Sequence, residues 1–156
     1  MRLVIFLLLF IFPGGLLHEP PELCEPIAAR CNTEALPFTT AELDILYRIA
    51  WAEARGEDDK GIILVINVIL NRMAHPQFPN TVHDVVFQRN QFTPVTDGAF
   101  DRAIPCDRIV DLVHQALLDD LSKGALFFNT TSLRETSWAA RNRTYLFTHG
   151  GHSFYL

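Results

Sequence analysis

In the 156-residue sequence, the position of Glu53 would allow its carboxyl group to act as a general acid. Glu53 follows Leu46 and Ala50 at spacings of four and three, so on a helix it continues their apolar stripe. A carboxylate rarely occupies such a face unless it is paired or functional. Desolvation there would raise the pKa of Glu53 above the ~4.3 of a free glutamate, toward ~6, so that the group could serve as a general acid.

A structural role for Glu53 is the alternative. Its carboxylate could pair with Arg55, with Arg72 or with a helix N-terminus. Glu57 lies in an acidic run just after a glycine, and we expect it to occupy a solvated turn or to cap the following helix.

Two helices should position this segment. The first is expected over residues 40–55, opened by a capping box of Thr39 and Glu42. The second is expected over residues 60–73 and is apolar on nearly its whole circumference, which predicts burial at the centre of the domain. Its many β-branched residues leave a buried strand as the alternative.

The rest of the chain predicts shorter elements and a mainly helical α+β fold. We expect a short helix over residues 81–87, a long loop over 88–106 and a last helix over 107–121. Three short strands are expected over residues 126–128, 145–147 and 153–155. The result is one domain, residues 39–156, with a small C-terminal β element.

The N-terminal residues look separate from this domain. Residues 1–17, with Arg2 before an apolar run, are typical of a signal peptide or signal anchor. Residues 18–38 form an irregular arm that contains prolines and cysteines. We therefore expect export to the periplasm, the cell envelope or the extracellular space, with membrane contact only through an uncleaved leader.

Cysteine content and charge narrow the function classes further. Export permits a disulfide, of which Cys24 with Cys31 is the simplest, and Cys106 is then expected to be a small packing residue. The net charge of −5 and the lack of a long Lys/Arg run exclude a nucleic-acid partner on electrostatic grounds.

Several segments occur in the order typical of one family and span residues 42–156: 49–57 with the apolar helix ending at Arg72, 76–82, 90–95, 124–128, 137–139 and 151–155. They resemble the SleB-type cell wall hydrolases, the spore-cortex-lytic enzymes and their relatives. The resemblance implies a lysozyme-like fold and peptidoglycan cleavage, usually as a lytic transglycosylase. The family's catalytic glutamate matches Glu53, and we expect no cofactor.

A lytic transglycosylase needs one carboxyl group, because the sugar's own 6-hydroxyl captures the reacting centre and gives a 1,6-anhydro product. A water-using muramidase needs two carboxyl groups. Asp97 is the candidate for the second, although an Asp–Gly turn with Gly98 is the favoured interpretation. A peptidoglycan-binding module without catalysis is a further alternative.

Sugar binding needs planar amides for hydroxyl and N-acetyl groups and aromatic faces for the rings. The segments that match the family supply Gln91, Phe92, Asn129, Trp138 and Tyr155, each of which could instead be structural.

The C-terminal histidines raise the question of a metal. His149 and His152 are three apart on a glycine-rich turn without a nearby third ligand, so no metal site is expected.

Overall fold

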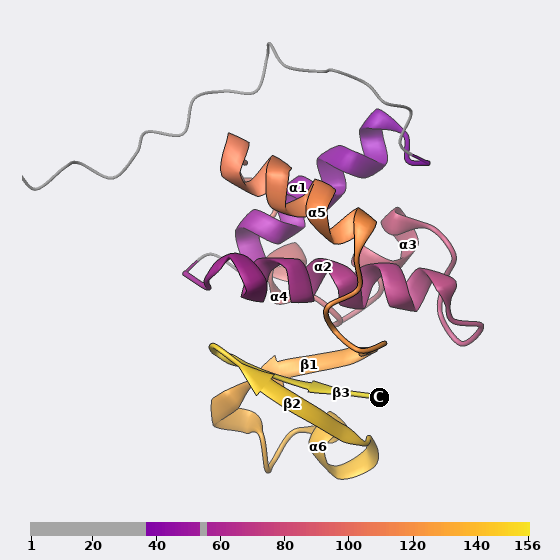
Figure 1. The fold of residues 1–156 in the computed structure, drawn as a ribbon, viewed down its shortest axis with the longest axis vertical. Coiled ribbons are helices and arrows are strands. Elements are labelled where there is room, and N and C mark those ends of the chain that lie inside the picture. The colour runs from indigo at the N-terminus through magenta and orange to yellow at the C-terminus, as the bar shows by residue number, and fades with distance from the viewer. Residues whose placement is uncertain (1–36, 54–55) are drawn as a thin grey trace, which may run out of the picture.

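The computed structural model describes residues 37–53 and 56–156. Its helices are α1 (Thr40–Glu53), α2 (Asp59–Ala74), α3 (Val82–Val86), α4 (Thr93–Thr96), α5 (Asp107–Leu118) and α6 (Trp138–Asn142), with a 3₁₀ turn at Thr131–Leu133. Its strands are β1 (Phe127–Thr130), β2 (Tyr145–His149) and β3 (His152–Tyr155). Figure 1 shows α2 lying between the other long helices and the sheet. The predicted mainly helical α+β fold is confirmed.

Helix α1 begins with the predicted capping box. The backbone N–H of Thr39 donates to Oε2 of Glu42 at 2.9 Å, and the N–H of Glu42 donates to Oγ1 of Thr39 at 3.3 Å. The bond from the Thr39 backbone is the main reason why the pKa of Glu42 lies below its ordinary value. Leu46, Ile49 and Ala50 are buried on the inner face of the helix. This anchoring fixes the direction in which the helix carries Glu53.

Helix α2 is the centre of the molecule, as its all-round apolar sequence predicts. One side contributes to a core shared with α1, α3 and α5. Another side, with Leu64 and Val68, packs against Ala125 and Phe154 of the sheet region. The buried strand considered as an alternative is therefore wrong. Asp58 caps the helix and accepts a bond from the N–H of Gly61 at 2.8 Å.

Asn67 of α2 explains why α5 ends earlier than expected. Its amide donates to the carbonyls of Ala116 and Asp119 at 3.0 Å each, and its oxygen accepts from the N–H of Leu121 at 3.0 Å. These bonds turn the chain at the end of α5, so that the helix stops at Leu118 and not near residue 121.

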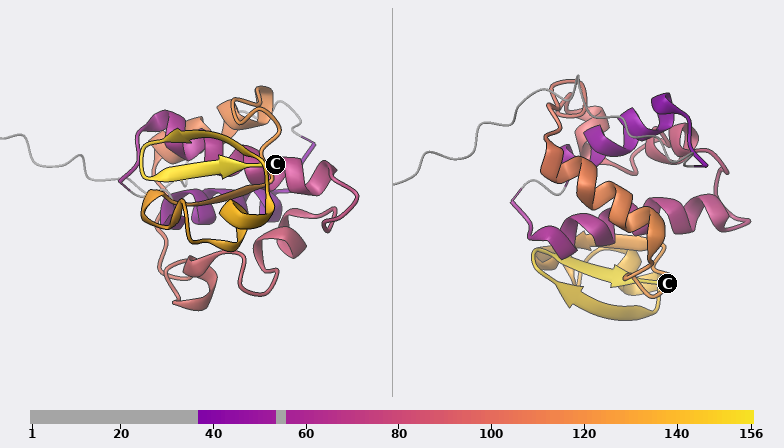
Figure 2. Two further views of the ribbon diagram at one scale, coloured as in Figure 1. Left: turned by 90° about the horizontal axis from the view of Figure 1, so that it is seen from below. Right: turned by 45° about the horizontal axis from the view of Figure 1, so that its top comes forward.

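The sheet has the strand order β1-β3-β2, with antiparallel neighbours. The central strand β3 is buried along its whole length. In register, Phe127 and Tyr145 lie opposite Tyr155 from the two sides. Figure 2 shows the sheet against one side of α2.

Two short helices differ from the expectation. Residues 88–106 were expected to form a loop, but they contain α4. Pro94 lies in the first turn of this helix, where proline is favoured. Helix α6 was not expected and is capped by Ser137, whose side chain accepts from the N–H of Ala140 at 3.0 Å. Both helices are too short to show a clear apolar period.

Parts of the sequence-based interpretation lie outside the described residues. These are the expected leader, residues 18–36 of the arm, and the pair Cys24 and Cys31. Cys106 is a free thiol, half-buried against the core. Within residues 37–53 and 56–156, no helix is long and apolar enough to span a membrane.

Candidate active site

Glu53 is the last residue of α1 and is half-buried. Its pKa is raised to about 7, first because burial removes water from the carboxylate and second because the negative charge of Asp97 lies nearby. The group can therefore hold a proton up to neutral pH, as a general acid must. Desolvation is the cause that its place on the apolar stripe predicts.

Asp97 joins the site through α4. It ends that helix, and its Oδ1 accepts from the N–H of Ala99 at 2.8 Å. Gly98 follows with a positive φ of 75°, so the expected Asp–Gly turn is present. The same carboxylate also acts electrostatically on Glu53. Asp97 is thus a turn residue whose negative charge also acts on Glu53.

Arg72 is engaged away from Glu53. Its Nε donates to the carbonyl of Leu126 at 2.7 Å. The guanidinium lies over the rings of Phe78, Phe92 and Phe127, at 5.2, 5.4 and 5.5 Å from their centroids. Burial lowers its pKa to about 10, so it stays charged at neutral pH. Arg72 thus ties α2 to β1, and the pairing with Glu53 considered from the sequence is absent.

Two of the five proposed sugar-binding residues are buried. Phe92 and Tyr155 are each 1 % exposed, so neither ring face is open to a ligand. The hydroxyl of Tyr155 donates to the backbone carbonyl of Arg134 at 3.3 Å. Both residues support the site from within the core.

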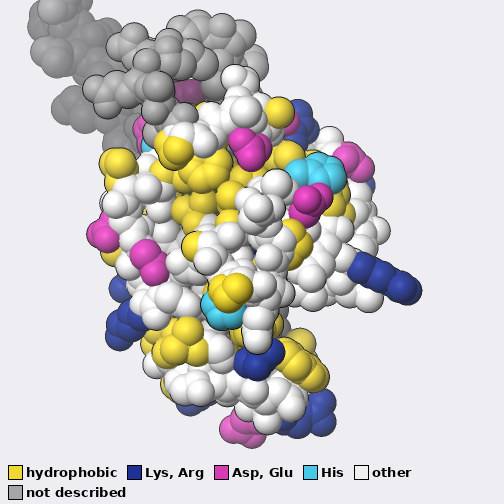
Figure 3. Space-filling model, turned by 90° about the vertical axis from the view of Figure 1, so that its right-hand side faces the viewer, with side chains coloured by type: hydrophobic (Ala, Val, Ile, Leu, Met, Phe, Trp, Pro, Cys, Tyr) yellow, Lys and Arg dark blue, Asp and Glu magenta, His cyan; other side chains and the backbone are white. Residues whose placement is uncertain are grey.

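The other three residues are more accessible. Gln91 is exposed just before α4, the helix that carries Asp97 toward Glu53. Trp138 is 54 % exposed on α6, with the guanidinium of Arg143 4.8 Å from its ring centroid. Figure 3 shows basic and hydrophobic side chains over the lower part of the molecule, where the sheet lies.

Asn129 has a different environment from Gln91 and Trp138. It is half-buried on β1, and its amide donates to Oγ of Ser137, the residue that caps α6. Its Oδ1 accepts from the Tyr155 hydroxyl at 3.5 Å. The side chain therefore holds α6 against the sheet, next to Trp138.

Glu57 was expected in a solvated turn or as the cap of α2, and the structure corrects both, since Asp58 is the cap. Each of its carboxylate oxygens lies 3.1 Å from the backbone nitrogen of Gly151, in the turn between β2 and β3. The Glu57 side chain is only 17 % exposed. Sequence reasoning missed this contact because it joins residues far apart in the chain. The pair Gly150-Gly151 was the one signal that a close approach was required.

The two histidines of this hairpin have separate surroundings. Nε2 of His149 lies 2.7 Å from Oδ1 of Asp58. His152 is buried, and its ring meets that of Phe128 edge to face. In the part of the chain that the structure describes, no three His, Cys, Asp or Glu side chains gather as a metal site requires.

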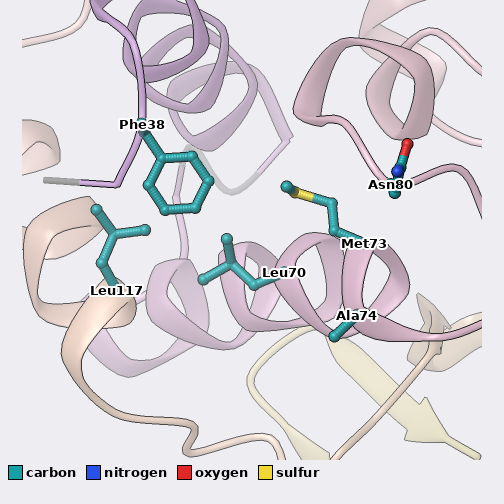
Figure 4. A pocket seen from close by; sticks show the side chains of 6 residues that line it. All are labelled: Phe38, Leu70, Met73, Ala74, Asn80 and Leu117. Atoms are coloured by element: carbon teal, nitrogen blue, oxygen red, sulfur yellow. The ribbon is translucent and has the colours of Figure 1, made fainter.

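An open apolar groove of about 390 Å³ has a lining that does not include Glu53. Figure 4 shows its lining by Phe38, Leu70, Met73, Ala74, Asn80 and Leu117. These residues come from the segment before α1, the later part of α2, the segment between α2 and α3, and the end of α5. It contains none of the groups considered for catalysis.

The sequence matches the Cell Wall Hydrolase family over residues 56–155, beginning just after Glu53. It is 41 % identical over 61 residues to a spore cortex-lytic enzyme of Bacillus subtilis (strain 168), covering 39 % of this chain and 20 % of that protein. It is 31 % identical over 102 residues to a spore cortex-lytic enzyme of Oceanobacillus iheyensis, and this match covers 65 % of this chain and 37 % of that protein. The matches thus span well under half of these relatives.

Two solved structures are similar along nearly their whole length. The catalytic domain of the germination-specific lytic transglycosylase SleB from Bacillus anthracis has a TM-score of 0.69 and 29 % identity, covering 77 % of this chain and 98 % of that one. The catalytic domain of Bacillus cereus SleB has a TM-score of 0.69 and 28 % identity, covering 83 % and 99 %. The expected lysozyme-like architecture is confirmed. The chain belongs to the SleB-type family of cell wall hydrolases.

Proposed function

We propose that this chain cleaves the glycan strands of peptidoglycan as a lytic transglycosylase, with Glu53 as its general acid. The observation that carries the proposal is the half-buried carboxyl at the end of α1, whose pKa is raised to about 7. The similar SleB domain described as a lytic transglycosylase supports the same activity.

The mechanism uses one carboxyl group twice. Protonated Glu53 donates its proton to the glycosidic oxygen that leaves C1 of N-acetylmuramic acid, and the C1–O bond breaks. The electron-poor centre that forms at C1 is captured by the 6-hydroxyl of the same sugar. Glu53, now a carboxylate, accepts the proton of that hydroxyl. The products are a 1,6-anhydro end and a free 4-hydroxyl on the other strand, and Glu53 is protonated again.

Asp97 favours one alternative function. A carboxylate near Glu53 could activate water, and the enzyme would then be a muramidase that leaves reducing ends. One oxygen of Asp97 accepts the Ala99 N–H in the turn, which suits a fixed charge better than a proton acceptor. We therefore assign Asp97 to raising the pKa of Glu53 and to stabilising positive charge that develops on the sugar.

For substrate contact we retain Gln91, which is exposed just before α4, and Trp138, which is exposed on α6. The amide of Gln91 suits hydroxyl or N-acetyl groups, and the face of Trp138 suits a sugar ring. Asn129, Phe92 and Tyr155 would act through their support of these segments.

The test is digestion of insoluble peptidoglycan by the purified protein, with mass spectrometry of the released fragments. We expect 1,6-anhydro-muropeptides, and a loss of at least ~10²-fold in rate for Glu53→Gln, because a general acid contributes on that order. Asp44→Asn is the matched control, since Asp44 is an exposed carboxylate on the same helix. Reducing-end products would instead establish a muramidase, and binding without release would establish a non-catalytic module.

The substrate also requires export, because peptidoglycan lies outside the cytoplasmic membrane. We propose that residues 1–17 provide the leader and that any membrane contact is through that leader if it is retained. A targeting protein would then account for choice among periplasm, envelope and extracellular wall. N-terminal sequencing of the protein recovered from cells tests whether the leader is removed.

A further inference from the structure

The carboxylate of Glu57 links the helical layer to the β2–β3 hairpin. It follows Glu53 by four residues and precedes α2. Both of its oxygens lie 3.1 Å from the backbone nitrogen of Gly151. Figure 1 shows the hairpin turn beneath the N-terminal end of α2. A hydrogen bond from an amide to a half-buried carboxylate is stronger than one between neutral groups.

The turn is built of residues that leave room for this carboxylate. A Cβ atom at either Gly150 or Gly151 would come closer than 3.0 Å to the Glu57 carboxylate, a separation that real Cβ atoms essentially never show. Gly61 provides the matching space on α2, where a Cβ would lie 2.8 Å from Cβ of Glu57. Three glycines thus surround one acidic side chain.

Neighbouring polar groups contribute less than the Gly151 amide. Nδ1 of His152 lies 3.7 Å from Oε1 of Glu57, but burial lowers the pKa of His152 and so disfavours the charged ring that an ion pair needs. The contact of His149 with Asp58 involves a carboxylate that is 65 % exposed, where water screens the interaction.

We propose that Glu57 is a positioning residue for the catalytic acid: its bond to Gly151 anchors residue 57 at the hairpin turn and so restricts where the Glu53 carboxyl, four residues earlier, can lie. Two positions four residues apart can be separated by at most about 14 Å, so fixing one restricts the other. The inference rests on the proposed role of Glu53. It assigns the hairpin turn, which carries no acid of its own, a part in catalysis.

The test compares alanine at two glycines of similar backbone conformation. Gly150 has a φ of +51° and Gly124 a φ of +76°, but a Cβ at Gly124 would have no atom within 4 Å. Gly150→Ala should displace the flexible carboxylate, whereas Gly124→Ala reports only the strain of alanine at positive φ. We expect kcat of Gly150→Ala to fall ~10-fold or more with KM little changed, because a shift of about 1 Å in a reacting group can reduce the rate ~10²-fold. Gly124→Ala should keep the kcat of the parent.

Glu57 itself provides the second comparison, without a backbone change. Glu57→Ala should match Gly150→Ala, and Glu57→Gln, which keeps an acceptor oxygen, should recover most of kcat. A Glu53 released from its place would be more hydrated, so the alkaline limb of the kcat profile should move to lower pH in Glu57→Ala. A purely structural role would lower thermal stability without moving this limb.

The outcomes separate this inference from the proposed function. If the parent protein releases no glycan fragments, the function proposed for Glu53 is wrong. If the parent is active and Glu57→Ala keeps both its kcat and its pH profile, the positioning role is wrong. Should Gly150→Ala fail to fold, the two Glu57 variants decide the question alone.

Discussion

At the scale of single residues, two causes act in the same direction on Glu53. Burial is the larger, and the charge of Asp97 adds to it. The first follows from where α1 ends, and the second from a turn more than forty residues later in the chain. The sequence pattern predicts the first, since it places Glu53 on an apolar stripe. The sequence pattern gives Asp97 only as a candidate neighbour of Glu53, because the residues that surround a turn depend on how the distant elements pack.

Removing the Asp97 charge should change the pH dependence of activity. The pKa of Glu53 should fall in Asp97→Asn, but only part of the way to 4.5, because desolvation is the larger cause. The alkaline limb of the rate profile, near pH 7 in the parent, should therefore move to lower pH. Initial rates from pH 4 to 9 measure it. An unmoved limb would show that Asp97 does not act on Glu53.

The same pKa has a consequence for stability. The pKa of Glu53 is about 7 in the folded chain against 4.5 as an ordinary value, so the folded state binds the proton more tightly. This stabilisation is complete below pH 4.5 and is lost as the pH rises through 7. Glu53→Gln cannot ionise, so its stability relative to the parent should increase between pH 5 and pH 8, by on the order of 2 kcal/mol. Urea unfolding at the two pH values measures this, and an equal difference at both would contradict it.

At the scale of elements, local patterns predict more than distant contacts do. The capping box of Thr39 and Glu42 and the buried face of α2 follow from spacing alone. Helices α4 and α6 have too few residues to show a period; α4 has a proline in its first turn, and α6 is capped by Ser137. The contact of Glu57 with Gly151 joins residues 94 apart, so no local pattern contains it.

Asn67 tests how one buried amide organises an element. Asn67→Ala would leave the carbonyls of Ala116 and Asp119 and the N–H of Leu121 without this partner. Each buried group left unpaired costs about 1–3 kcal/mol, so we expect a loss of about 3 kcal/mol or more in the free energy of unfolding. Asn142→Ala is the control, because its amide makes an exposed bond to Trp138. Urea denaturation compares the two, and equal losses would refute the role of Asn67.

At the scale of the whole molecule, α2 is shared by two cores. One core joins it to the helices, and the smaller one joins it to the sheet. Composition and patterning predict that both layers exist, but they do not place the sheet on α2, since this depends on which side chains of an all-apolar helix face which layer. A shared central helix should make the layers unfold together.

Leu64→Ala tests this coupling. Leu64 is fully buried in the smaller core beside Phe154. Its truncation should reduce the free energy of unfolding by about 2–5 kcal/mol. Far-UV circular dichroism, which follows the helices, and near-UV circular dichroism, which follows aromatic packing, should still give coincident transitions. Separate transitions would mean that the sheet folds independently of the helical layer.

The incomplete burial of Glu53 gives the substrate a part in preparing its own cleavage. Glu53 is only half-buried in the free protein. A glycan strand laid over it would remove more water from its carboxyl, and the pKa of Glu53 would rise further in the complex than in the free enzyme. Binding and protonation are then thermodynamically linked, so that each favours the other. Binding of the glycan strand would therefore keep Glu53 protonated until the proton is transferred to the glycosidic oxygen of that strand.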